Sequence, residues 1–160
     1  MLITRVPMKV YLAGPLFSEQ DRKKLEEIAR LLAENGIEVY LPHRDAGDLG
    51  SVKIPYGRTT IRERLFARDV LEVKRCDLLV ALLDGADVDS GTAVEIGIAH
   101  TLKIPVIGLK SDFHRRNRTV NNMIWGACRG GNALVFDVNN LLKQANSLSK
   151  QIGKRMKLKK

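Results

Sequence analysis

Five short apolar segments alternate with amphipathic stretches along the chain. Their continuous apolar character is typical of strands that are buried on both faces. Strands that alternate with helices in this way form a parallel sheet covered by helices on both sides. The pattern predicts an α/β fold with a five-stranded parallel sheet, a flavodoxin-like or Rossmann-like three-layer sandwich. The predicted strands lie at residues 9–14, 37–42, 77–83, 104–109 and 133–138.

The stretches between the strands carry helix boundary signals. Ser18 can cap a first helix, and Asn35-Gly36 can end it because glycine adopts left-handed backbone without strain. Residues 141–148 have the periodicity of a last helix. No internal repeat is apparent, so we expect one α/β domain over residues 1–149, followed by a basic C-terminal tail over residues 150–160.

In an open parallel sheet, ligands bind beyond the carboxyl ends of the strands, near the point where the strand order reverses. The loops "AGPLFSEQD" and "DGADVDSG" follow the first and third predicted strands at this edge. Residues 42–60 and 110–122 follow the second and fourth, and both are long for connections of this type. These two long segments are therefore candidate binding loops.

The segment "DVDSGTAVEIG", residues 87–97, places acids directly before a helix of small residues. Ser90 can cap this helix, which extends through Leu102. Glu95 lies in its first turns, where it can reach the crevice at the strand ends and where the helix start favours the ionised carboxylate. Glu95 is therefore a candidate nucleophile, with an ordinary solvated glutamate as the alternative.

A second unusual carboxyl is Asp69. Ile61, Leu65, Asp69 and Val73 follow one another at i+4 spacing, which predicts that the acid lies on the buried stripe of its helix. A salt bridge to an arginine of "RERLFARD" is one explanation for a buried carboxyl. Catalysis is the other, because desolvation raises the pKa of a carboxyl and lets it hold a proton near neutral pH. One ionised and one protonated carboxyl are the pair that cleaves a glycosidic bond with retention.

Composition narrows the remaining possibilities. The 160 residues, 44% hydrophobic and 28% charged, suit a single soluble domain, and no membrane span or signal peptide is apparent. Cys76 and Cys128 make no disulfide framework, so a reducing cytoplasm is the expected setting. His43, His100 and His114 are scattered without the spacing of metal ligands. The sequence contains neither GxGxxG nor GxxxxGK[ST], which argues against the common dinucleotide and triphosphate cradles.

The net charge of +9 is concentrated near the end of the chain. Residues 150–160 hold six basic residues and no acid, which leaves only +3 for the rest. A second cluster, "HRRNR" at residues 114–118, lacks the interleaved aromatic residues of a base-stacking surface. A dedicated nucleic-acid binder is therefore not favoured, and the tail is interpreted as a solvated basic segment.

With these residues identified, the sequence resembles the nucleoside 2-deoxyribosyltransferase family, which also includes hydrolases of deoxynucleoside 5′-monophosphates. The resemblance extends from about Tyr11 to Trp125. "YLAGPLF" is similar to the family's opening strand and loop, and "ARDVLEVKRCD" to its acid-bearing helix. "DVDSGTAVEIG" is similar to its nucleophile segment, and "VNNMIWG" to its late substrate-site motif. Several separate motifs in the family order are more specific than any one of them.

The resemblance implies a role for each matching residue. Glu95 would be the nucleophile, and Asp69 would donate a proton to the base and accept one from it. Tyr11 would help to orient the nucleophile, Phe17 would line the base pocket, and Asp89 would face the nucleoside. The remaining residues implied to bind substrate are Gly14, Ser90, Gly91, Asn121 and Met123, the last two in a motif that family members contribute to a neighbouring subunit's site. The basic extension after Lys150 departs from the usual family ending.

The expected activity is cleavage of the N-glycosidic bond of a 2′-deoxynucleoside through a covalent deoxyribosyl-Glu95 intermediate, with transfer of deoxyribose to another base. The reaction requires neither a metal nor an organic cofactor. The expected partners are the deoxynucleoside, the free base and further copies of the chain in a dimer or dimer-based homo-oligomer with shared sites, without membrane association.

Two alternatives to this activity remain open, a 2′-deoxynucleoside 5′-monophosphate N-hydrolase and a non-catalytic nucleotide-binding module. Asp89 stands where the resembling phosphate-accepting hydrolases carry a serine, and its charge would repel a 5′-phosphate. This favours an unphosphorylated nucleoside. Arginines in the long loops are the argument for a nucleotide, because they could bring a phosphate-binding charge into the crevice.

Overall fold

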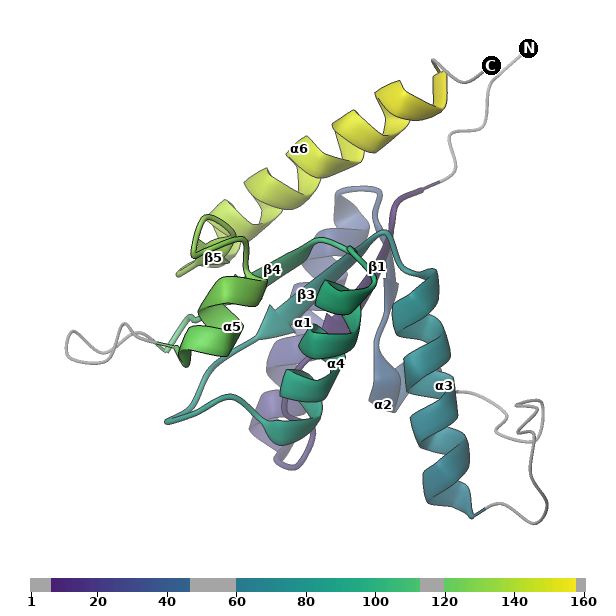
Figure 1. The fold of residues 1–160 in the computed structure, drawn as a ribbon, viewed down its shortest axis with the longest axis vertical. Helices are drawn as coiled ribbons and strands as arrows, with labels where there is room; N and C mark the ends of the chain where they lie inside the picture. Colours follow the sequence, from purple (N-terminus) through teal and green to yellow (C-terminus); the bar gives the residue numbers. More distant parts are fainter. Residues whose placement is uncertain (1–6, 47–59, 113–119, 158–160) are drawn as a thin grey trace.

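The computed structural model describes residues 7–46, 60–112 and 120–157. Five parallel strands form one sheet in the order β2-β1-β3-β4-β5 (Figure 1). All five predicted strands are present, and the predicted α/β fold with a parallel sheet is confirmed. The strands are β1 (Lys9–Ala13), β2 (Glu38–Tyr40), β3 (Leu78–Leu82), β4 (Val106–Leu109) and β5 (Leu134–Val135).

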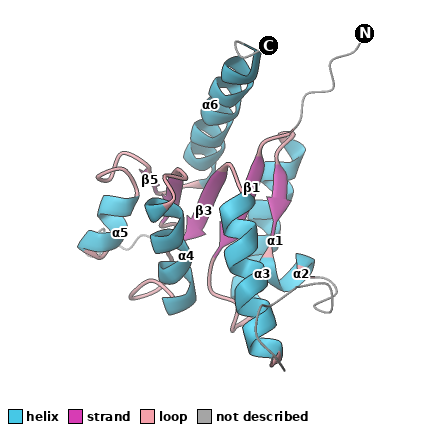
Figure 2. Ribbon diagram, turned by 45° about the vertical axis from the view of Figure 1, so that its right-hand side comes forward, coloured by secondary structure: helices cyan, strands magenta, loops and turns pink. Residues whose placement is uncertain are grey.

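Helices cover both faces of this sheet (Figure 2). In Figure 1, α1 lies behind the strands, and α3 and α4 lie in front of them. The short helix α5 packs against α4, whereas α6 contacts α1 and the strands β4 and β5. The helices are α1 (Glu19–Glu34), α2 (Pro42–Asp45), α3 (Ile61–Arg75), α4 (Ser90–Thr101), α5 (Asn122–Ala127) and α6 (Val138–Lys157).

The boundaries of α1 agree with the sequence signals. The Ser18 side chain accepts a hydrogen bond from the Asp21 backbone N–H at 3.0 Å, which satisfies one free donor of the first turn. Gly36 follows the helix with a φ of 74°, the left-handed conformation that glycine adopts without a Cβ clash. Both predicted boundary residues are confirmed.

The stripe predicted for α3 is buried only in its second half. Val73 is fully buried and Asp69 is half-buried, but Ile61 is 70% exposed and Leu65 is exposed. In Figure 1 the first turns of α3 extend beyond the strands, where no sheet surface covers them. The prediction of one continuous buried stripe is therefore wrong, because helical spacing does not reveal how far a helix projects past its sheet.

The last helix is longer than the sequence pattern predicted. Apolar positions that pack against the core continue at Leu148 and Ile152, so α6 runs through residue 157. Residues 150–157 thus continue this helix. None of the helices in the described ranges is long and apolar enough to cross a bilayer.

The sheet order places the expected ligand edge between β1 and β3. The chain passes from β1 to β2 on one side and returns to β3 on the other side of β1, which makes this pair the switch point of the sheet. The two long candidate loops lie largely outside the described residues, which exclude 47–59 and 113–119. The described part of the site is therefore built from β1, β2, α3, α4 and the loops after β1 and β3.

Candidate active site

Tyr11 and Tyr40 form the floor of the site. They are register partners of the neighbouring parallel strands β1 and β2, so their side chains project from the same face of the sheet. Their rings stack with centroids 5.5 Å apart and an interplanar angle of 26°. Sequence reasoning identified Tyr11 but missed Tyr40, although a tyrosine at the carboxyl end of the adjacent strand was the available signal.

Glu95 is held directly above Tyr11. Helix α4 packs on β3, and the Tyr11 hydroxyl donates a hydrogen bond to Glu95 Oε1 at 2.5 Å. Burial keeps the pKa of Tyr11 far above its ordinary value, and the Glu95 charge reinforces this, so the phenol retains its proton and acts as the donor. The structure therefore brings together the predicted nucleophile and its predicted orienting residue.

Burial dominates the protonation of Glu95. Desolvation raises the pKa of Glu95 to about 7, the Tyr11 hydrogen bond opposes this, and the charges of Asp69 and Asp89 add to it. The expectation that the helix start keeps Glu95 charged is corrected. Glu95 is the sixth residue of α4, beyond the first turn in which the helix terminus acts strongly. This carboxyl exchanges its proton near neutral pH.

Asp69 reaches the same site from α3, which packs against β1 and α4. Desolvation raises the pKa of Asp69 to about 6, while Arg68 lowers it and Glu72 raises it. Asp69 Oδ1 is buried and has no hydrogen-bond partner among the described residues. The Arg68 guanidinium, a predicted salt-bridge partner of Asp69, instead lies with its Nε 3.5 Å from Glu72 Oε1. Asp69 is therefore a second carboxyl that titrates near neutral pH.

Together these side chains can support displacement at a glycosidic carbon. Glu95 supplies a carboxylate, Asp69 supplies a carboxyl that can carry a proton, and Tyr11 supplies a fixed donor. Within the described ranges, no group of three or more His, Cys, Asp or Glu side chains could hold a metal ion.

A sequence model of the nucleoside 2-deoxyribosyltransferase family matches residues 10–142, which include Tyr11, Asp69 and Glu95. The chain belongs to this family. No curated protein matches the chain.

Solved structures agree with this family assignment. A conserved protein from Enterococcus faecalis V583 is 26% identical with a TM-score of 0.71, and the match covers 86% of this chain and 96% of that one. The 2-deoxyribosyltransferase from Bacillus psychrosaccharolyticus is 25% identical with a TM-score of 0.67, covering 84% and 90%. The CMP N-glycosidase BcmB from Clostridium botulinum, 21% identical with a TM-score of 0.55 and covering 86% and 98%, shares the fold.

Within the segment "DVDSGTAVEIG", residues 87–97, Asp89 precedes helix α4. Asp89 Oδ2 accepts hydrogen bonds from the Thr92 backbone N–H at 3.0 Å and from the Thr92 hydroxyl at 3.1 Å. Asp89 is therefore the N-cap of α4, and the prediction that Ser90 caps this helix is wrong. Both residue types cap well, but Asp89 has the non-helical backbone that directs its side chain to the free N–H groups, whereas Ser90 is already the first residue of the helix. Ser90 and Gly91 are exposed at the start of the helix.

Two residues of the family's opening loop differ in their surroundings. A Cβ on Gly14 would lie 2.6 Å from Leu25 Cδ2 and 3.2 Å from Leu82 Cβ, so Gly14 allows α1 to approach the end of β1 closely. Phe17 is 88% exposed. Packing thus accounts for Gly14, and a role of Phe17 in a base pocket stays a prediction.

The late family motif lies on α5. Asn121 caps this helix by accepting a hydrogen bond from the Met123 backbone N–H at 2.8 Å. Ile124 is buried in the core, but Met123 is 81% exposed and Trp125 is exposed. No hydrogen bond joins Asn121 or Met123 to Glu95 within the described part of the chain. The structure of one subunit therefore leaves these two residues on the surface.

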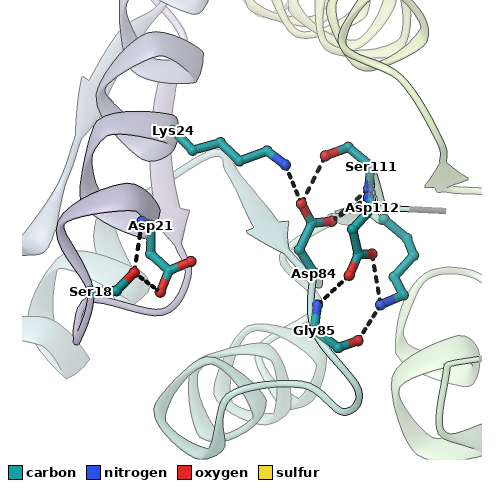
Figure 3. Close-up of polar contacts among 8 residues, drawn as sticks. Ser18, Asp21, Lys24, Asp84, Gly85, Ser111 and Asp112 are labelled. Atoms are coloured by element: carbon teal, nitrogen blue, oxygen red, sulfur yellow. Dashed lines mark hydrogen bonds and ion pairs between the residues drawn. The ribbon is translucent and has the colours of Figure 1, made fainter. Parts of the chain in front are cut away.

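A polar network that the family motifs did not reveal secures the loop before α4 (Figure 3). Asp84 accepts hydrogen bonds from Ser111 N at 2.6 Å, Ser111 Oγ at 2.8 Å and Asp112 N at 3.1 Å, and it pairs with Lys24 of α1. Gly85 N donates to Asp112 Oδ2 at 2.6 Å. The network connects the ends of β3 and β4, and so fixes the loop that leads to Glu95.

Proposed function

We propose that this protein cleaves the N-glycosidic bond of 2′-deoxynucleosides and transfers the deoxyribosyl group to another base. The observation that carries the proposal is the half-buried Glu95 carboxyl, hydrogen-bonded to Tyr11 at 2.5 Å and close enough to Asp69 for the charge of one to affect the other. The match to the nucleoside 2-deoxyribosyltransferase family supports the same activity.

The reaction proceeds in two displacements. A Glu95 oxygen attacks C1′ of the deoxyribose while the bond from C1′ to the base nitrogen breaks and Asp69 gives its proton to the departing base. The nitrogen of a second base then attacks C1′, the ester bond to Glu95 breaks, and Asp69 recovers a proton. Tyr11 holds the nucleophile in position through its hydrogen bond. The steps need no metal and no organic cofactor.

Asp89 supports an unphosphorylated nucleoside as the substrate. Its charge raises the pKa of Glu95, which indicates that it acts on the same site. A carboxylate there repels a 5′-phosphate dianion but accepts a hydrogen bond from a free 5′-hydroxyl. One Asp89 oxygen is engaged by Thr92, and the other is available for such a bond.

The shared site of a homo-oligomer is part of the proposal. Met123, Trp125 and Phe17 expose apolar side chains that a second subunit would cover. The polar Asn121 lies beside Met123 at the start of α5. A twofold assembly that buries this surface would bring both residues to the neighbouring subunit's nucleoside.

Chromatography of deoxyadenosine incubated with the protein, with and without a second base, tests the proposed function. Transfer gives adenine and a new deoxynucleoside, and hydrolysis gives adenine and free deoxyribose. Release of no adenine, together with measurable binding, would identify a nucleotide-binding module and overturn the proposal. Glu95→Ala should abolish base release, and wild type quenched during turnover should carry a deoxyribosyl adduct on Glu95 by mass spectrometry.

A further inference from the structure

Glu72 is a buried carboxylate that the proposed reaction does not use. Its side chain is only 4% exposed, and Lys9 Nζ lies 2.6 Å from its Oε2. On the other oxygen, Arg68 Nε lies at 3.5 Å and an Arg75 guanidinium nitrogen at 3.7 Å. A buried carboxylate needs such partners, because an uncompensated charge in this position is strongly destabilising. The ion pairs thus fix Glu72 at the border of the site.

Arg68 has two acids within reach on its own helix, Asp69 at the next position and Glu72 one turn later. Its guanidinium lies with Glu72. Arg68 Nε and Asp69 Oδ1 are both buried and lack a hydrogen-bond partner among the described residues. A direct bond between them would satisfy both groups and would be strengthened by their charges. In the structure the Arg68 charge still lowers the pKa of Asp69, but the guanidinium lies toward Glu72 and the Tyr40 hydroxyl and makes no ion pair with Asp69 among the described residues.

We propose that Glu72 is a positioning residue that holds the Arg68 guanidinium away from Asp69, so that Asp69 remains able to carry the proton for the leaving base. Lys9 completes the arrangement by anchoring Glu72 from β1. The importance of this arrangement for turnover rests on the proposed function. The positioning itself is a property of the folded protein and is measurable without substrate.

The groups around Asp69 predict that removal of Glu72 and removal of Arg68 change the pKa of Asp69 in opposite directions. Tyr11 faces it from β1, Tyr40 from β2 and Glu95 from α4, while Arg68 and Glu72 flank it on α3. Burial is the main cause that raises the pKa of Asp69, Arg68 lowers it and Glu72 raises it. Removing Glu72 frees the Arg68 cation to pair with Asp69, whereas removing Arg68 takes that cation away.

The experiment is a pH titration of the Asp69 carboxyl by NMR in protein carrying carbon-13-labelled aspartate, with the Asp69 resonance assigned from its loss in Asp69→Asn. Glu72→Gln should lower the pKa of Asp69 by about one unit, and Arg68→Gln should raise it by about half a unit to one unit. Arg68→Lys keeps the positive charge, so the pKa of Asp69 in this variant should stay close to its wild-type value. Arg75→Gln is the matched control, because Arg75 contacts Glu72 from the solvent side, with its side chain 60% exposed.

The proposal is supported if Glu72→Gln lowers the pKa of Asp69 clearly more in the wild type than in the Arg68→Gln background, because only a repositioned guanidinium depends on Arg68. An equal or absent lowering in the two backgrounds overturns it. If Glu72→Gln does not fold, Arg68→Gln and Arg68→Lys decide: an unchanged Asp69 pKa in both refutes the charge balance. The acid limb of the kcat profile should move with the NMR value in each variant, because the pKa of Asp69 lies below that of Glu95. An Arg68-dependent effect of Glu72→Gln on the pKa of Asp69 in a protein that cleaves no nucleoside would retain the positioning and reject the proposed function, so the two failures are distinguishable.

Discussion

The Tyr11 hydroxyl donates a hydrogen bond to Glu95 Oε1 at 2.5 Å across 84 sequence positions, and so connects the middle of the sheet to α4. It is also the interaction that lowers the pKa of Glu95 against the effect of burial. One hydrogen bond therefore both orients the proposed nucleophile and favours its charged form.

Tyr11→Phe should impair the nucleophile and leave the ring stacked on Tyr40. A hydrogen bond to a charged group contributes about 1.5–3 kcal/mol, so we expect kcat/KM at neutral pH to fall about 10- to 100-fold. Loss of the bond should also raise the pKa of Glu95, which already lies above that of Asp69, and so move the alkaline limb of the rate profile to higher pH. Steady-state rates over a pH series check this, with thermal unfolding as the control for folding. An unmoved alkaline limb would contradict the assigned role.

The pH profile of the wild type should be bell-shaped. Activity requires Glu95 without its proton and Asp69 with its proton, but the pKa of Glu95 is about 7 and that of Asp69 is about 6. The active form is therefore the minor singly protonated form of the pair, so the acid limb follows the lower value and the alkaline limb the higher one. The maximum should therefore lie between these values, and the two apparent constants belong to the pair. Asp69→Asn should remove the alkaline limb and slow poor leaving bases most. A wild-type rate that still increases above about pH 8 would rule out Asp69 as the proton donor.

Glu95→Gln should increase stability at alkaline pH. The folded-state pKa of Glu95 is raised from 4.5 to about 7, so the wild type has its full stability below the unfolded value and loses stability as the pH rises through the folded one. The variant avoids this loss and should be more stable by up to about 3 kcal/mol near pH 8, with no gain below the unfolded pKa. Urea unfolding at both pH values measures the difference. Glu34→Gln, at an exposed position of α1, is the control.

Asp89→Ser tests the choice between nucleoside and nucleotide. We expect the wild type to have a higher kcat/KM for deoxyadenosine than for its 5′-monophosphate. The ratio of these two values should be smaller in the serine variant. Serine also caps helices, so α4 should remain intact. Asp89→Asn removes the negative charge but keeps the size of the side chain, so it shows whether the charge alone determines the substrate preference. A wild-type preference for the monophosphate would overturn the nucleoside assignment, and an unchanged ratio would remove Asp89 from the specificity.

Met123→Glu tests the shared interface. We expect light scattering to find the wild type as a dimer or a dimer-based assembly, and the variant to dissociate because a charge is buried in an apolar contact. Leu102→Glu changes an exposed apolar residue at the end of α4 and should keep the assembly. A wild type that is monomeric and fully active would refute the proposal of shared sites.

Local patterns in the sequence determined the strands, the start of α1 and the two central carboxyls. Continuous apolar runs predicted every strand because burial on both faces leaves no alternation. Ser18 capped α1 as predicted because an N-cap bond spans only a few residues. Glu95 and Asp69 stood out because each is a carboxyl among apolar or small residues within one helix. These features are encoded over short distances along the chain.

Only the tertiary structure decided the protonation, the partners and the exposure of these side chains. The pKa of Glu95 is set by desolvation from every segment packed around it, which outweighs the helix terminus that sequence reasoning emphasised. Tyr40 joined the site through strand register, and Arg68 paired with Glu72 although Asp69 is adjacent in sequence. The extent of α3 beyond the sheet decided which of its apolar residues are exposed. Burial and pairing depend on segments far apart in the chain, so no local pattern contains them.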